Sequence, residues 1–230
     1  MPETDPLTLA TSELPAASTA LSAGDEAVSK LAADFRALIL NVTNASARAA
    51  GEAGRLHSDD VSNPAGVARQ PSELPGRLKA DTQDHLDSAD VQLDIIEGMH
   101  LAAILHHDSR DDANLRAELH NYTVNLEQKN AVATLVELAA DPRYSTYMAG
   151  PLGKSLAARF NLDGSIFRKV ALESLAVNGS RDQVARSAAL AAIPAARRVI
   201  GLAKGGRDAV SEQVQRPPKP QQQRINALMP

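Results

Sequence analysis

The fold is decided by residues 81–141, DTQDHLDSADVQLDIIEGMHLAAILHHDSRDDANLRAELHNYTVNLEQKNAVATLVELAAD. Apolar side chains recur at helical spacing on both sides of the polar turn at 106–112, which predicts two long helices. The short turn makes them antiparallel neighbours, a central helical hairpin, and Asp141-Pro142 ends the second helix near residue 140. The stretch also holds five of the six histidines: His85, His100, His106, His107 and His120.

The composition favours helices over the whole chain. Hydrophobic residues make up 43% of the 230 residues but aromatic residues only 3%, and alanine supplies much of the apolar fraction. Closely packed helices suit such a composition better than a sheet does. We therefore predict an all-α fold: the long antiparallel hairpin, a C-terminal bundle of shorter helices, and flexible arms at both termini. The absence of cysteine excludes disulfides and thiolate metal sites.

The rest of the chain divides by its composition. Our predicted segments are a flexible N-terminal arm at 1–23, an amphipathic helix at 24–50, a Pro/Gly-rich connector at 51–80, a basic helical region at 142–215 and a Pro/Gln-rich tail at 216–230. Local signals place helix ends in the basic region. Pro151 suits a first helical position, Asp163 or Ser165 can cap the next helix, Ser180 can cap the one after, and Pro194 should kink or split it.

Charge is distributed unevenly. Residues 1–150 carry 11 Lys/Arg and 23 Asp/Glu, whereas residues 151–230 carry 13 Lys/Arg and 5 Asp/Glu. This polarity predicts either head-to-tail association between copies or a basic segment that faces nucleic-acid phosphates. The alternative is ordinary pairing of oppositely charged faces within one chain.

One enzymatic motif lies at the hairpin turn. Residues 102–108, AAILHHD, run from an apolar helix into a His-Asp pair. This resembles the signature of HD-domain metal phosphohydrolases, which are all-helical and hydrolyse phosphoesters with divalent metal. The resemblance implies His107 and Asp108 as the ligand pair, His85 or His57 as the earlier ligand, and Asp163 or Asp182 as the later one. Bound metal would activate water there. The likeness covers seven residues, and Ser109-Arg110-Asp111 replaces the family's usual Ile-Gly-Lys.

Two further motifs resemble functional sites but can also be explained as ordinary helix structure. Glu97-Gly98-Met99-His100 matches the Glu-x-x-His element of di-iron bundles, but no second copy exists, so we expect His100 at a helix–helix contact. The segment QVARSA at 183–188, with RVI at 198–200, resembles the helix-turn-helix of repressors, and its basic character suits DNA. However, Ala189–Ala192 favour an unbroken helix where that motif needs a turn.

We expect a non-enzymatic structural or interaction subunit of a larger assembly, such as a phage virion or a secretion apparatus. The expected partners are copies of the chain or neighbouring subunits, with nucleic acid as a further candidate for the basic half and no cofactor. No apolar run reaches the roughly 20 residues of a membrane span. The acidic N-terminus lacks the apolar core of a secretory signal, which favours the cytoplasm or such an assembly. The alternatives are the metal phosphohydrolase and the DNA-binding protein.

Overall fold

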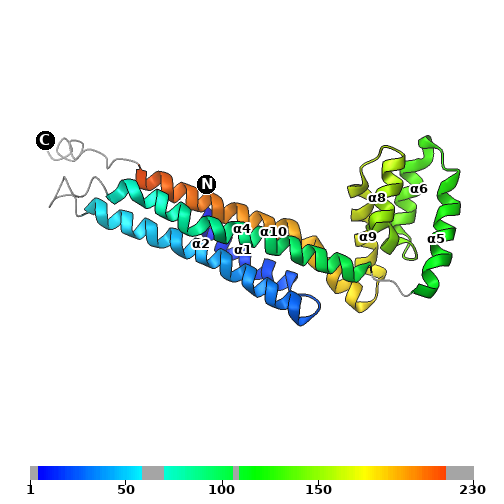
Figure 1. Cartoon of the computed structure of the whole chain (residues 1–230), viewed down its shortest axis with the longest axis horizontal. Coiled ribbons are helices and arrows are strands. Elements are labelled where there is room, and N and C mark those ends of the chain that lie inside the picture. Colours follow the sequence, from blue (N-terminus) through cyan, green and yellow to red (C-terminus); the bar gives the residue numbers. More distant parts are fainter. Residues whose placement is uncertain (1–4, 59–69, 106–108, 216–230) are drawn as a thin grey trace, which may run out of the picture. The chain divides into compact units, whose positions relative to one another are not determined.

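The computed structural model describes residues 5–58, 70–105 and 109–215 (Figure 1). Within these ranges the regular elements are all helices and no strand occurs, which confirms the predicted all-α class. The helices are α1 Pro6–Leu21, α2 Glu26–Ser58, α4 Gln70–Ile104, α5 Ser109–Val124, α6 Gln128–Ala140, α7 Ser145–Ala149, α8 Pro151–Arg159, α9 Gly164–Asn178 and α10 Arg181–Gln215. No helix in the described ranges is long and apolar enough to cross a membrane.

The described residues form two compact units. The first unit contains residues 5–18, 33–58, 70–92 and 195–215. The second contains residues 19–32, 93–105 and 109–194. Helices α1, α2, α4 and α10 each contribute residues to both units.

The first unit is a bundle of long helices (Figure 1). The buried residues of α10 in this unit include the series Ala196, Ile200, Ala203, Arg207, Val210 and Val214, beside Val199 and Gly206; those of α2 include the series Phe35, Ile39, Val42, Ser46, Ala49 and Ala53, beside Thr43. Both series alternate steps of three and four residues, which is typical of left-handed packing between helices. The many alanines allow the helix backbones to lie close together.

Contacts along α10 establish the helix directions in this unit. On one side, Arg198 pairs with Glu13 of α1 at 3.2 Å. On the other side, Arg207 donates to the side-chain oxygen of Gln83 at 2.9 Å, and Arg197 lies 3.9 Å from Asp90. Residue numbers fall on α4 as they rise on α10, so these two helices are antiparallel.

The second unit has an aromatic core. It contains five of the six aromatic residues, and Tyr144, Phe160 and Phe167 are among its buried core residues. Helix α9 packs against α6, α7 and α8. A hydrogen-bond chain joins α6, α7 and α9: the Ser145 hydroxyl donates to Ser174 at 2.9 Å, and Ser174 donates to the Ala140 carbonyl at 2.8 Å.

Three local signals for helix starts in the basic region are confirmed. Pro151 occupies the first turn of α8. Asp163 caps α9, because its carboxylate accepts a hydrogen bond from the Ser165 backbone N–H at 2.9 Å. Ser180 and Gln183 form a reciprocal capping box at the start of α10, with distances of 2.9 and 3.3 Å.

The N-terminal segment, expected to be a flexible arm, contains helix α1. Asp5 accepts hydrogen bonds from the backbone N–H and the hydroxyl of Thr8, at 3.2 and 3.1 Å, and so caps the helix. The buried face is Ala10, Leu14, Ala17 and Leu21. Two of these four residues are alanines, so a search for larger apolar side chains overlooks the helical period.

The Pro/Gly-rich connector is also shorter than expected. Helix α2 continues through Gly51 and Gly54 to Ser58, and α4 already begins at Gln70. A glycine inside a helix costs about 1 kcal/mol relative to alanine. Burial of Ala49 and Ala53 against the bundle offsets this cost. Of the expected connector, 59–69 lies outside the described residues, as does the tail at 216–230.

The second hairpin helix, expected as one element over about 112–140, is divided into α5 and α6. The Arg159 guanidinium donates to the carbonyls of Thr123 and Val124, at 3.1 and 2.9 Å. In an unbroken helix these carbonyls would accept bonds from residues four positions later. Gln128, at the start of α6, donates to the Phe160 carbonyl at 2.8 Å. The turn at 106–108 lies outside the described residues, so the hairpin itself stays a prediction.

Candidate functional site

The metal site of the phosphohydrolase hypothesis is not tested by the structure. His107 and Asp108 lie outside the described residues, and His85 is a half-buried residue of α4. Within the described ranges, no three His, Asp or Glu side chains cluster so that they could hold a metal ion. The site therefore stays a prediction, and elemental analysis of the purified protein would test it.

The proposed later ligands have structural partners. Asp163 accepts hydrogen bonds from the Ser165 backbone and hydroxyl, at 2.9 and 2.7 Å, and these bonds lower the pKa of its carboxyl. Asp182 accepts a hydrogen bond from Arg186 at 2.7 Å. Both carboxylates thus stabilise helix structure. The His57 side chain lies outside the described part of the chain.

His100 lies at a helix–helix contact, as expected. Its side chain is fully buried, and Nε2 is 3.1 Å from the Leu21 carbonyl at the end of α1. Among the described residues, Nδ1 has no hydrogen-bond partner. Glu97 is separately engaged, because it accepts from Arg168 at 3.1 Å. The two polar residues of Glu-x-x-His therefore make different structural contacts.

The segment that resembles a helix-turn-helix is continuous. Helix α10 extends from Arg181 to Gln215 through Pro194, so residues 189–192 form no turn, and the expected split is absent. Arg186 is only 9% exposed and lies against the loop at Gly24, where a β-carbon would meet its guanidinium at 2.9 Å. The unbroken helix lacks the turn that this DNA-binding motif requires.

Part of the charge asymmetry is balanced within the chain. In the first unit, Arg197 and Arg198 pair with acids of α4 and α1. In the second unit, Arg168 pairs with Glu97. These three cations of residues 151–230 therefore pair with acids of residues 1–150, which at these positions favours ordinary charge pairing within one chain.

A hollow of about 580 Å³ lies among α4, α8 and α9 in the second unit. Its lining includes Leu101, Leu105 and Met148 and the charged residues Lys154, Asp163 and Arg168. Asp163 already caps α9, and Arg168 is paired with Glu97. Two of its three charged groups are thus occupied by structural contacts.

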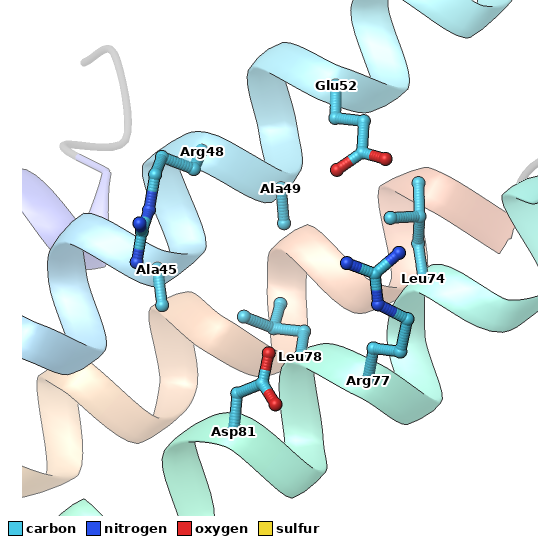
Figure 2. Close-up of a pocket in the computed structure, with 8 residues that line it drawn as sticks. All are labelled: Ala45, Arg48, Ala49, Glu52, Leu74, Arg77, Leu78 and Asp81. Carbon is cyan, nitrogen blue, oxygen red and sulfur yellow. The ribbon is translucent and has the colours of Figure 1, made fainter.

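The candidate site is a groove between α2 and α4 in the first unit (Figure 2). It has a volume of about 250 Å³, and Ala45, Ala49, Leu74 and Leu78 form its apolar floor. Four exposed charged residues flank this floor: Arg48 and Glu52 on α2, and Arg77 and Asp81 on α4. We call these four residues the charged rim.

Charges of opposite sign alternate around the charged rim. Because α2 and α4 are antiparallel, Arg48 lies level with Asp81 and Glu52 lies level with Arg77 (Figure 2). Each helix therefore presents one cation and one acid, and each cation has an acid across the groove. The rim as a whole has no net charge.

Within the described part of the chain, none of the four rim residues forms an ion pair. On both helices the cation precedes the acid by four residues. This order is less favourable for pairing within one helix than the reverse order. The four side chains are thus available to a partner.

The site is not apparent from the sequence, because its two halves are far apart in the chain. The signal that could have found it is the repeated pattern of Arg followed four residues later by an acid, at 48–52 and 77–81. No family model, curated protein or solved structure matches the chain. Function is therefore inferred from the chain's own geometry.

Proposed function

We propose that the protein is a non-enzymatic helical subunit that binds other protein chains within a larger assembly. The observation that carries this proposal is the α2–α4 groove, with its apolar floor and unpaired charged rim. Apolar seams flanked by charges are the surfaces through which helices recognise one another: the apolar residues supply contact area and the charges select partner and register.

The packing of the first unit supports the same function. One wall of the groove is α2, which has a buried series at coiled-coil spacing, so an added helix surface would find the same geometry there. Leu74 and Leu78 are each 4% exposed, which leaves little further apolar area to bury. We therefore expect binding of moderate strength, with specificity set by the rim.

The kind of assembly is a further part of the proposal. Helical subunits that associate repeatedly through modest surfaces are suited to large structures such as a phage virion or a secretion apparatus. The uneven charge of the two halves of the chain is compatible with such association, although Arg168, Arg197 and Arg198 of the basic half pair with acids of the acidic half.

Photo-crosslinking tests the proposal. A photoreactive amino acid placed at Arg48 or at Arg77 should give adducts with defined protein chains in the cells that make the protein. The same group at Arg36, an exposed arginine of α2 that does not line the groove, is the matched control. Adducts from positions 48 and 77 but not from 36 are expected. Absence of protein adducts at both groove positions would refute the function.

A further inference from the structure

The alternating charges of the charged rim favour one particular partner. Resting on the proposed function, we propose that its occupant is a second copy of this chain, bound face to face about a two-fold axis that places each rim cation against a rim acid of the other copy.

The alternating charges make the groove complementary to itself. A two-fold axis parallel to the helices would lay α2 over the α4 helix of the second copy. Arg48 then faces the partner's Asp81, and Glu52 faces the partner's Arg77. Every cation thus meets an acid, as an isologous interface requires.

The other in-plane two-fold axis, perpendicular to the helices, gives the same result. It lays α2 over the second copy's α2 in the antiparallel direction, so Arg48 faces the partner's Glu52. On α4, Arg77 likewise faces the partner's Asp81. A partner surface of a single charge sign would instead be repelled by half of the rim, which is why the pattern favours a second copy.

Two glycines beside the rim leave room for a close approach. Gly51 adjoins Glu52 on α2, and Gly76 adjoins Arg77 on α4. A β-carbon at either glycine would have no atom within 4 Å. The same open space surrounds Gly54, Gly98, Gly201 and Gly205, so it permits a close approach at Gly51 and Gly76 but does not single these positions out.

Sedimentation velocity of complementary charge variants tests the inference. Arg48→Glu with Arg77→Glu makes the rim entirely acidic, and Glu52→Arg with Asp81→Arg makes it entirely basic. We expect the wild type to dimerise, with an affinity that falls as salt screens the rim pairs. Each double variant alone should dimerise at least tenfold more weakly. An equimolar mixture of the two should recover a one-to-one dimer.

The matched control is Lys30→Glu with Arg36→Glu. It changes the net charge by the same amount as Arg48→Glu with Arg77→Glu, but at exposed positions of α2 outside the groove. It should dimerise like the wild type, and circular dichroism should show unchanged helicity in all variants. Three outcomes would overturn the inference: a monomeric wild type, double variants that self-associate as tightly as the wild type, or a mixture that does not associate. If the wild type is monomeric but positions 48 and 77 cross-link to a different protein, the second-copy inference fails and the proposed function stands.

Discussion

Gly206 of α10 lies directly against Leu7 of α1. A β-carbon at Gly206 would come within 2.5 Å of the Leu7 side chain and 3.1 Å of its backbone nitrogen. The contact lies near the N-terminal end of α1, the helix that was expected to be a flexible arm. Close packing at this glycine therefore helps to hold α1 on the bundle.

Gly206→Ala should destabilise the first unit. The added methyl group must displace Leu7, and overpacking of this kind typically costs about 1–3 kcal/mol. Urea unfolding followed by circular dichroism would measure the loss in free energy of unfolding.

Gly205→Ala is the matched control, because a β-carbon there would have no atom within 4 Å. Alanine is the better helix former, so this variant should gain about 0.5–1 kcal/mol. If the two substitutions changed stability equally, the packing of α1 against Gly206 would be contradicted.

Arg159→Ala should destabilise the second unit, since the Val124 carbonyl would lose its donor and the Thr123 carbonyl would keep only the Leu126 backbone N–H. Arg159 is exposed, so we expect a loss of about 1 kcal/mol, as for an ordinary hydrogen bond and below the range for hydrogen bonds to charged groups. Arg181→Ala removes another exposed arginine and should have a smaller effect in the same denaturation experiment. Equal losses would mean that Arg159 does not stabilise the end of α5.

The stability of the protein should depend on the protonation of His100. Burial lowers the pKa of this side chain below its usual 6.5, its hydrogen bond to Leu21 opposes that shift, and the charge of Arg186 adds to it. Asp25 and Asp182 act weakly in the opposite direction. The fold thus favours neutral His100. Its contribution is fully present above pH 6.5 and is lost as pH falls from there towards the lowered folded-state pKa.

His100→Gln should reduce this pH dependence. Glutamine has an amide donor for the Leu21 carbonyl but does not titrate, so the variant should lose less stability than the wild type between about pH 7.5 and about pH 5.5. Denaturation at both pH values would measure the difference. His120→Gln, at an exposed position, should leave the wild-type dependence unchanged. The role of His100 would be disproved by an unchanged pH dependence in His100→Gln.

The sequence predicted features that depend on a few adjacent residues. Pro151 at a helix start, the Asp163 cap and the stop at Asp141-Pro142 all follow from local backbone chemistry, and the structure confirms them. Features that depend on tertiary contacts were missed. α1 and the glycine-containing part of α2 are stabilised by alanines that are buried against other helices. α5 ends where Arg159 donates hydrogen bonds to the carbonyls of its last residues.

The candidate groove was missed for the same reason. Arg48 and Glu52 look like ordinary surface charges of one helix, as do Arg77 and Asp81 of another. Their alternation becomes apparent only when antiparallel packing brings the two helices together (Figure 2).

The most direct test of self-association through the groove is a distance measured between copies. The chain has no cysteine, so Ala47→Cys allows a single spin label on an exposed residue next to Arg48 that does not line the groove. Pulsed electron paramagnetic resonance should show one intermolecular distance between the labels. We expect it to be no longer than about 20–24 Å, the combined width of two helices. That distance should vanish when Arg48→Glu and Arg77→Glu are added. If the label in the otherwise wild-type chain gave no intermolecular distance, or if the distance persisted with the acidic rim, the account would be contradicted.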